Sequence, residues 1–400
     1  MKIFVLLSRV PYPIEKGDKL RAFHQIRCLA QNHEIVLCAL SDSEVNPDAV
    51  KVLGEFCSEI HILPLRRAGM VWNVVKAFFN GKPIQVGYFY RCSVRKKVNK
   101  IIEKCSPDHI FCQLTRVSEY VKDSRIPKTL DYQDVFSMGA KRRAENSSFL
   151  MKMIFMMEYR RLRHYEHYIF GKFDHKTIIS EPDRDLLPHT SRNEVVVIPN
   201  GVDHEYFSPV KGPKTHDIVF TGNMGYPPNI DAARFMAEEI FPLVLRQIPG
   251  AKLLLAGATP HARILALQSE NITVTGWLED IRSSYATSRI FIAPMRIGTG
   301  LQNKLLEAMP MELPCITSVL ANQALGAKEN EEILIGTTTR EYADHIIHLL
   351  QNETYARTLA AKGHTFVRKI FSWENSTAQL ERLFTAGKKK ESISANQQER

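Results

Sequence analysis

The sequence lacks paired cysteine motifs. It holds seven cysteines, an odd number, and none of them forms a Cys-x-x-Cys pair. The histidines and cysteines also lack the spacing of a zinc site. Scattered thiols of this kind are typical of reduced, mostly buried cysteines in a cytosolic protein, so a disulfide framework is not expected.

The sequence also lacks a hydrophobic run of the roughly 18 residues that a bilayer-spanning helix needs. The apolar N-terminus, MKIFVLLSRVPYP, is too short for a secretion signal and has no small-residue cleavage site. It is better explained as a first buried parallel strand. The sequence therefore predicts a cytoplasmic protein.

A concentrated basic region is missing as well, although basic residues are in excess. Lysine and arginine number 53 against 43 aspartates and glutamates, which gives a formal net charge of +10. Such an excess suits an anionic partner, such as a nucleotide or a phospholipid surface. Because the excess is diffuse, nucleic acid is not the expected partner.

The chain is long enough for two domains with sizeable cores, with 400 residues of which 44% are hydrophobic. Short apolar strands alternate with helical segments in both halves, which predicts an α/β fold with parallel sheets. We place an N-terminal domain at residues 1–200, a C-terminal domain at 201–370 and a last helix at about 371–386. The polar residues 387–400 are predicted to form a disordered tail.

The stretch Phe291–Ile316 predicts a strand, a glycine loop, a helix and a second strand. The loop contains Gly298-Thr299-Gly300, and the helix after it carries Lys304 and Glu307 on one face. Free amides at the start of such a helix, with a lysine beside them, would bind phosphate, and the carboxylate would hold sugar hydroxyls. The alternative is an ordinary βαβ unit with an exposed Lys–Glu pair.

Other candidate residues follow predicted strands, where ligands bind in open α/β sheets. Gly17 would let a ligand approach the backbone and Arg21 could reach a phosphate, the alternatives being a turn glycine and a surface charge. Asp131 and Asp134 could hold an acceptor hydroxyl or accept its proton. For Asp134 the alternative is a helix cap.

The segment Met70–Phe79, MVWNVVKAFF, is apolar or aromatic and is flanked by basic residues. It has two interpretations. One is a weak contact with the inner-membrane surface, as such segments can make. The other is a lid helix that packs on its own domain.

The order of motifs in the second half is specific: PNGVDHEYFSP, IVFTGNMGYPPN, LLLAG, ITVTGWLEDI and APMRIGTGLQNKLLEAM. With RVPYPIEKGDKLR near the N-terminus, the chain resembles a GT-B glycosyltransferase of family 4, the group 1 enzymes, over nearly its whole length. The subgroup that it resembles is linked to bacterial exopolysaccharide synthesis. The resemblance implies two Rossmann-like domains facing a central cleft, with the nucleotide-sugar bound mostly by the C-terminal domain and the acceptor by the N-terminal one. It also implies a last helix that crosses back to the N-terminal domain.

The resemblance also implies residue roles. Lys304 matches the lysine on the donor diphosphate, and Glu307 matches the second glutamate of an E-x7-E pair, which holds ribose hydroxyls. Thr299 stands where the first glutamate often lies, so the donor sugar stays open. An arginine that often assists the lysine is missing, and Arg296 could replace it. The predicted donor-binding residues are Gly17, Arg21, Gly222, Asn223, Arg296, Gly298, Thr299, Gly300, Leu301, Asn303, Lys304 and Glu307, and the predicted catalytic residues are Lys304, Asp131 and Asp134.

Together these features predict a retaining transferase that moves a hexose from a UDP- or GDP-sugar to a glycan or a lipid-linked saccharide. The resemblance implies that neither a metal nor another cofactor is needed. A GT-B epimerase or phosphorylase is a second interpretation, but no pyridoxal-binding lysine motif is evident. A third is a non-catalytic partner in a polysaccharide-assembly complex, which the missing first glutamate favours.

Overall fold

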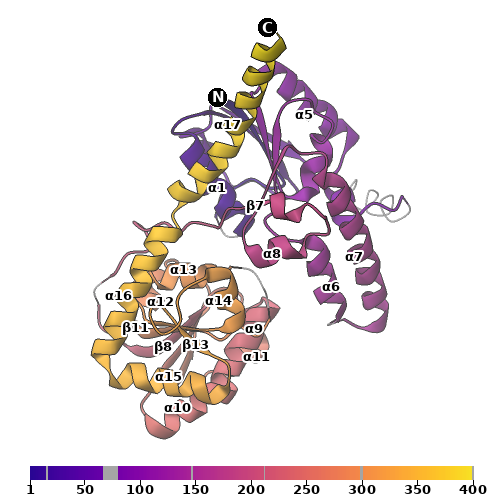
Figure 1. Cartoon of the computed structure of the whole chain (residues 1–400). Coiled ribbons are helices and arrows are strands. Elements are labelled where there is room, and N and C mark those ends of the chain that lie inside the picture. The colour runs from indigo at the N-terminus through magenta and orange to yellow at the C-terminus, as the bar shows by residue number, and fades with distance from the viewer. Residues whose placement is uncertain (15–16, 66–79, 146, 211, 298–300, 399–400) are drawn as a thin grey trace. The chain divides into compact units, whose positions relative to one another are not determined.

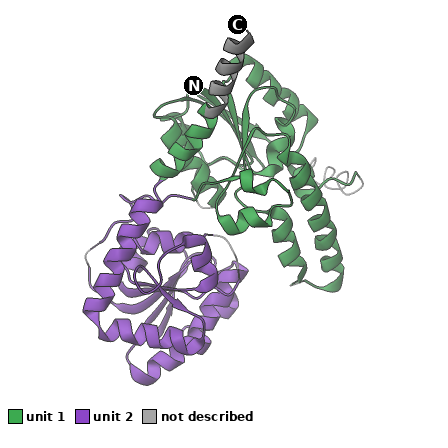
Figure 2. Ribbon diagram, viewed as in Figure 1, with its two compact units in different colours: residues 1–199, 373–400 green, residues 200–372 purple. Residues whose placement is uncertain are grey.

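The computed structural model describes residues 1–400 except 15–16, 66–79, 146, 211, 298–300 and 399–400, with side chains up to residue 385. The segment Met70–Phe79 and the loop Gly298–Gly300 therefore lie outside the described residues. The chain forms two compact units (Figure 2): residues 1–199 with 373–400, called unit 1, and residues 200–372, called unit 2.

Unit 1 is built on a seven-stranded parallel sheet in the described part of the chain, with the order β3-β2-β1-β4-β5-β6-β7. Its strands are β1 (Lys2–Leu7), β2 (Glu34–Ser41), β3 (Glu59–Pro64), β4 (His109–Gln113), β5 (Lys128–Asp131), β6 (His175–Ile178) and β7 (Val196–Val197). Its helices are α1 (Gly17–Leu29), α2 (Ala49–Gly54), α4 (Ile84–Phe89), α5 (Cys92–Cys105), the 3-10 helix η1 (Thr115–Tyr120), α6 (Phe136–Glu145), α7 (Phe149–Phe170), α8 (Glu181–Leu186), the 3-10 helix η2 (Arg192–Glu194) and α17 (Trp373–Gln398).

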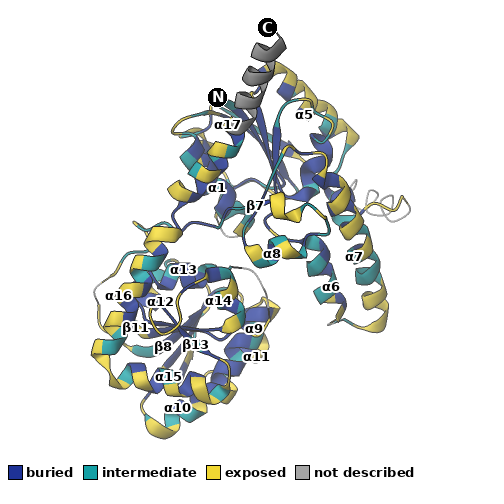
Figure 3. Cartoon of the chain, in the orientation of Figure 1, coloured by how far each residue is buried: buried dark blue, intermediate teal, exposed yellow. Residues whose placement is uncertain are grey.

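The unit 1 sheet is buried on both faces, as a parallel sheet covered by crossover helices must be. Alternate residues of β1 show this: Phe4 and Leu6 belong to one hydrophobic cluster, and Ile3 and Val5 belong to another. In Figure 3 the strands are dark blue while the outer faces of the helices are exposed. The apolar run at the N-terminus is thus a central strand, as the sequence predicts.

The C-terminal helix α17 packs on α1, so the chain returns to the unit in which it began. Leu380 and Phe384 are buried in the same cluster as Ile26 of α1, and the Phe384 ring lies 4.3 Å from that of His109. This confirms the predicted crossing. Helix α17 is drawn to Gln398, and the predicted disorder of residues 387–400 stays a prediction. Residues 387–400 contain no proline, the residue that most strongly disfavours a helix.

Unit 2 is built on a six-stranded parallel sheet in the described part of the chain, with the order β10-β9-β8-β11-β12-β13. Its strands are β8 (His216–Thr221), β9 (Leu253–Ala256), β10 (Ile272–Val274), β11 (Ser288–Ala293), β12 (Cys315–Ser318) and β13 (Leu334–Gly336). Its helices are α9 (Pro227–Arg234), the π-helix η3 (Phe235–Ile240), α10 (Phe241–Gln247), α11 (Ala262–Leu265), α12 (Arg282–Ala286), α13 (Asn303–Ala308), α14 (Val319–Leu325), α15 (Thr339–Gln351) and α16 (Glu353–Ile370).

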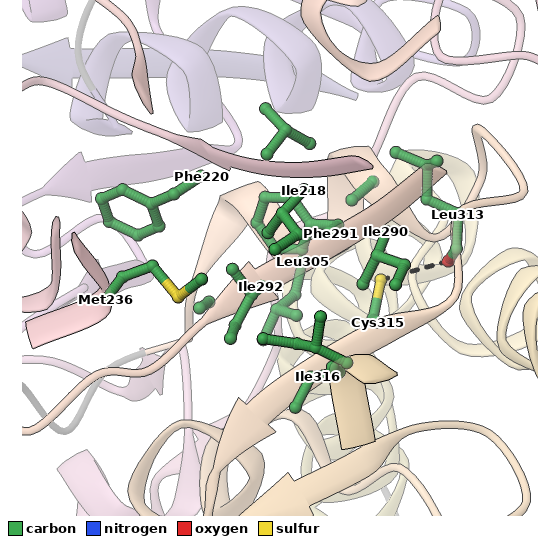
Figure 4. Close-up of a cluster of buried hydrophobic side chains, with 14 of the residues drawn as sticks. Ile218, Phe220, Met236, Ile290, Phe291, Ile292, Leu305, Leu313, Cys315 and Ile316 are labelled. Carbon is green, nitrogen blue, oxygen red and sulfur yellow. Dashed lines mark hydrogen bonds between the residues drawn. The ribbon is translucent and has the colours of Figure 1, made fainter. Parts of the chain in front are cut away.

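The core of unit 2 is one continuous cluster around this sheet. Figure 4 shows Phe220 of β8, Phe291 of β11 and Ile316 of β12 packed against Leu305 of α13. The Leu305 contact fixes α13 against the strands. Lys304 is the residue immediately before Leu305 in this helix. Core packing therefore determines where that lysine lies.

A π-helical turn interrupts the helical segment from Pro227 to Gln247. Helix α9 is followed directly by η3, and η3 is followed directly by α10. Pro242 in the first turn of α10 has no amide hydrogen to donate and crowds the preceding turn. A π-helical turn immediately before the proline accommodates both defects.

In each sheet the strand order reverses its direction at one point. Ligands of open α/β sheets bind at the carboxyl ends of the strands at such a point. In unit 1 this point lies between β1 and β4, and in unit 2 it lies between β8 and β11. The loops after these four strands are therefore where a site is expected. Among the described residues, every helix is too short or too polar to cross a lipid bilayer.

Candidate functional site

The ammonium of Lys304 is the central feature of the unit 2 edge. Lys304 is the second residue of α13 and is only 8% exposed. Its Nζ donates to Oδ1 of Asn229 at 2.6 Å and lies 4.3 Å from the centre of the Phe220 ring. No carboxylate of the described residues forms an ion pair with it. A buried cation held by one amide oxygen and an aromatic face still has donor capacity for an anion.

Burial lowers the pKa of Lys304 to about 7, and the negative charge of Glu307 only partly opposes this shift. Burial disfavours the charged form of a lysine, whereas a nearby anion favours it. An anionic ligand at this position would therefore stabilise the ammonium and bind to it strongly. Strongly shifted groups of this kind are common at functional sites.

Glu307, one helical turn from Lys304, is held by a chain of hydroxyls. Tyr285 donates to Oε2 of Glu307 at 2.7 Å, and the Tyr285 hydroxyl lies 2.8 Å from that of Thr221. Burial raises the pKa of the Glu307 carboxyl. The half-buried carboxylate is thus oriented by a tyrosine that is itself fully buried, and it can accept hydrogen bonds from ligand hydroxyls.

The backbone beside the lysine requires glycine. Gly222 follows β8 with φ of +151°, and a Cβ there would lie 3.1 Å from the Lys304 ammonium and 2.8 Å from Nδ2 of Asn229. Gly257 follows β9 with φ of +142°, and its Cβ would lie only 1.9 Å from the Gly222 carbonyl oxygen. Two strand ends therefore meet backbone to backbone beside the ammonium, and neither glycine position has room for a side chain.

The loop after Gly222 positions the partner of the lysine. Asn223 accepts through Oδ1 from the Gly225 amide at 2.9 Å and from the Thr259 hydroxyl at 2.7 Å. Its carbonyl accepts from Nδ2 of Asn229 at 2.9 Å, which turns the other end of that amide toward Lys304. Sequence reasoning missed Asn229 and Tyr285, because their side chains carry no charge and reach the site only through folding.

The remaining donor candidates near α13 have structural contacts. Leu301 packs against the unit 2 core, and Oδ1 of Asn303 accepts from Nδ2 of Asn200 at 3.4 Å. Helix α13 spans six residues, Asn303–Ala308, and includes Lys304 and Glu307 as the sequence predicts. The predicted Gly298, Thr299 and Gly300 lie outside the described residues.

Arg296 does not assist Lys304 in this structure. Its guanidinium donates to both carboxylate oxygens of Asp231, at 3.0 and 2.8 Å, and lies 3.5 Å from Glu239. It also stacks on the ring of Phe235, at 4.3 Å. Because its charge is already paired with carboxylates, the hypothesis that it replaces a missing site arginine is not supported by its contacts.

Arg21 and Asp131 form an ion pair inside unit 1. Arg21 donates to Asp131 through Nε at 2.7 Å and Nη2 at 3.1 Å, and both side chains are fully buried. Thr177 of β6 donates a third hydrogen bond to the same carboxylate, at 2.8 Å. Because both side chains are buried and paired with each other, these contacts do not support the phosphate contact predicted for Arg21 or the catalytic role predicted for Asp131, and both roles stay predictions. Gly17, predicted for close approach of a ligand, is exposed, and a Cβ there would meet nothing within 4 Å.

Asp134, by contrast, is accessible. Its side chain is 52% exposed and lies 3.9 Å from Arg142. Burial raises the pKa of Asp183 to about 6 and that of Glu166 to about 7, and the negative charge of Asp134 adds to both shifts. Asp134 is thus the exposed member of a group of three carboxyls near the ends of β5 and β6.

Three buried polar side chains lie at or just after the carboxyl ends of β4 and β5, and the sequence reasoning missed them. Nε2 of Gln113, Oγ1 of Thr115 and Nε2 of Gln133 have no hydrogen-bond partner among the described residues. Leu114, with φ of +71°, and Gln133, with φ of +61°, have left-handed backbones although neither is glycine. Unpaired polar groups and strained residues of this kind are typical of ligand sites.

In the described part of the chain, no group of three or more histidine, cysteine, aspartate and glutamate side chains is placed to hold a metal ion. The groups described above that could take part in chemistry are the Lys304 ammonium beside Gly222 in unit 2, and the buried polar side chains with the accessible Asp134 carboxylate in unit 1.

Part of the chain matches a known protein family. Residues 215–352, which include Lys304 and Glu307, match the family described as glycosyl transferases group 1. An uncharacterized 44.6 kDa protein of the cps region of Klebsiella pneumoniae is 22% identical over 399 residues, covering 93% of this chain and 98% of that protein.

Solved structures match over nearly the whole chain. Sucrose-phosphate synthase from Thermosynechococcus elongatus is 16% identical with a TM-score of 0.68, covering 96% of this chain and 99% of that one. The HepE protein of Anabaena in complex with UDP-glucose is 12% identical with a TM-score of 0.65, and the match covers 96% of this chain and 99% of that one. Residues 215–352 are thus similar to the group 1 glycosyl transferases, and the chain has the GT-B fold of two parallel Rossmann-like sheets.

Proposed function

We propose that this protein is a retaining glycosyltransferase that moves a hexose from a UDP- or GDP-sugar to a hydroxyl of a glycan or lipid-linked saccharide in bacterial polysaccharide synthesis. The buried Lys304 ammonium, which has no carboxylate in an ion pair among the described residues, is the observation that carries the proposal. The Anabaena relative was solved with UDP-glucose, and the Klebsiella relative is encoded in a cps region, which support the donor class and the setting.

In this proposal the donor diphosphate lies against Lys304 and the backbone at Gly222. Departure of the nucleoside diphosphate places negative charge on its oxygens, and the ammonium stabilises that charge more in the transition state than in the ground state. Removing one such donor typically costs about 3 kcal/mol, or a rate factor on the order of a hundred. Glu307, oriented by Tyr285, would accept from the ribose hydroxyls.

We assign the acceptor to the unit 1 edge. Gln113, Thr115 and Gln133 offer buried polar atoms for sugar hydroxyls, and Asp134 offers an accessible carboxylate that could accept a hydroxyl proton. This replaces Asp131, which the ion pair with Arg21 occupies. All seven cysteines are free thiols, five of them buried, which supports the proposed cytoplasmic location.

The test is a screen of UDP- and GDP-sugars for thermal stabilisation of the protein, followed by turnover of those that bind. A ligand that binds only the native state raises the melting temperature by mass action. We expect one nucleotide class to stabilise the wild type and to be turned over in the presence of a saccharide acceptor. If no nucleotide or nucleotide-sugar stabilises the protein at millimolar concentration, the donor-site assignment is wrong.

A second candidate is a non-catalytic partner in polysaccharide assembly, favoured by Thr299 in place of the first glutamate of the family pair. The same screen separates the two. Nucleotide binding with neither sugar transfer nor donor hydrolysis, across a panel of donors and acceptors, would support the partner and exclude the enzyme.

A further inference from the structure

A helical hairpin of unit 1 ends in exposed apolar side chains. Helices α6 and α7 lie side by side (Figure 1), and the first nine residues of α7, FLMKMIFMM, are called the α7 tip here. Phe149 is 80% exposed, Leu150 70% and Met153 59%. Large apolar side chains at successive positions of one helix end are unusual on a soluble surface, where exposed hydrophobics are normally single.

The apolar character of the α7 tip surrounds the whole helix axis. Eight of its nine residues are apolar, and Lys152 is the exception. An amphipathic helix that packs on its own domain has a polar face, whereas a helix that is apolar all round is normally buried. Residues 154–157 are half-buried, whereas the five residues before them are exposed. The start of the tip therefore lacks the apolar environment that the later part of α7 finds on unit 1 through Leu162 and Ile169.

The part of the chain that carries the tip is basic. The segment from Phe136 to Arg163 contains seven lysines and arginines and two glutamates. One of the two, Glu158, is buried and accepts from the amides of Ile84 and Gln85, so it does not offset the surface charge. The basic residues are Lys141, Arg142, Arg143, Lys152, Arg160, Arg161 and Arg163.

We propose that the α7 tip inserts into the headgroup region of an anionic lipid bilayer and holds the protein at that surface. Apolar side chains would enter the acyl boundary, and the surrounding lysines and arginines would contact lipid phosphates. Lys152 can reach the phosphates with its charge while its methylene chain stays among the apolar residues.

A membrane fits this surface better than a second copy of the chain. Two copies that met through their tips would bring two basic segments together, and like charges at close range oppose association. An anionic bilayer supplies both the apolar layer and the opposite charge. The inference goes beyond the proposed transfer reaction and does not depend on it, and it concerns a different segment from Met70–Phe79.

The test is co-flotation of the full chain with vesicles. Vesicles of phosphatidylcholine with about one-third phosphatidylglycerol are compared with phosphatidylcholine alone, at low and high salt, since salt screens the electrostatic part of such binding. We expect binding to the anionic vesicles, weakened by salt. The double variant Phe149→Ser/Leu150→Ser should bind roughly tenfold more weakly or worse, because two large apolar groups no longer enter the bilayer.

The matched control is Val50→Ser/Leu265→Ser, which removes two other large apolar residues, exposed by 53% and 52%, and should bind as the wild type does. Lys152→Glu should also weaken binding to anionic vesicles. The proposal is overturned if the wild type does not bind them or if the tip variant binds as strongly as the control. It is also overturned if light scattering shows a dimer that the tip variant abolishes, since a second copy would then cover the tip.

Discussion

Lys304 is a charged residue at a position that the unit 2 core nearly encloses. Its neighbours in the chain, Leu305 and Leu306, are core residues, and its own ammonium rests on Phe220. Burying a charge without a charged partner costs free energy, which a purely structural helix would avoid. The residue is therefore better explained by a ligand than by stability.

Replacing Lys304 with methionine tests that explanation through stability. Lys304→Met keeps much of the side-chain volume and removes the buried charge, so the melting temperature should stay equal or rise. Lys362→Met, at an exposed position of α16, is the control and should leave it unchanged. A clear fall in the melting temperature of Lys304→Met alone would show that the ammonium stabilises the fold.

The low pKa of Lys304 predicts a pH dependence. With a native pKa of about 7, against 10.5 for an ordinary lysine, the ammonium loses its proton in the unliganded native state as the pH rises above about 7. Nucleoside diphosphate affinity should then fall between about pH 7 and pH 9, measured by calorimetry, because binding must be accompanied by proton uptake.

The free energy of unfolding should change in the opposite direction from the affinity: it should rise with pH. Between about 7 and 10.5 the unfolded chain holds a proton that the native chain has lost, so this group makes unfolding harder as the pH rises. Below about 7 the full cost of the buried charge is present. Lys304→Met should abolish both trends, and an affinity that is constant from about pH 7 to pH 9 would contradict the assignment of the shift to the ligand-binding lysine.

At the scale of elements, the Arg21–Asp131 pair joins α1 to β5, and Thr177 adds β6. Asp131→Ala would leave a buried guanidinium without its partner and should lower the free energy of unfolding by about 3–5 kcal/mol, measured with denaturant. Asp134→Ala, at the exposed carboxylate, should leave stability nearly unchanged and lower turnover. If Asp131→Ala unfolded like the wild type, the structural role of the pair would be refuted.

The contact between the loops after β8 and β9 gives a second prediction for elements. Gly257→Ala would place a Cβ against the Gly222 carbonyl and force a left-handed backbone on alanine, so it should cost at least about 2 kcal/mol of stability and displace the Lys304 site. Gly276→Ala is the matched control, since a Cβ there meets nothing within 4 Å. Equal melting temperatures for the two variants would contradict the close approach of the two loops.

Elements with a strong local signal were predictable from the sequence. Buried parallel strands such as Phe291–Ala293 are unbroken apolar runs, and Lys304 and Glu307 share a helix face by spacing alone. The pairing of Arg21 with Asp131, 110 positions apart, was not predictable, because it depends on which strand lies beside α1. Asn229 was missed for the same reason, and the donor roles of the predicted site residues stay predictions.

At the scale of the whole molecule, chain order and spatial order differ. Helix α17 follows unit 2 in the sequence but completes the core of unit 1, where Phe384 packs on Phe111. The family match covers residues 215–352, within unit 2, whereas the likeness to solved structures covers 96% of the chain. The fold of both units is therefore shown, and the function proposed for them rests mainly on the chemistry at Lys304.

The most direct test of that chemistry is the affinity of the full chain for UDP and GDP, measured by calorimetry at pH 7 for the wild type, Lys304→Met and Lys362→Met. The account predicts that at least one nucleotide binds the wild type and Lys362→Met equally, and binds Lys304→Met on the order of a hundredfold more weakly, because the diphosphate loses a buried ammonium. Equal affinity for all three proteins would show that the diphosphate does not meet Lys304 and would contradict the account.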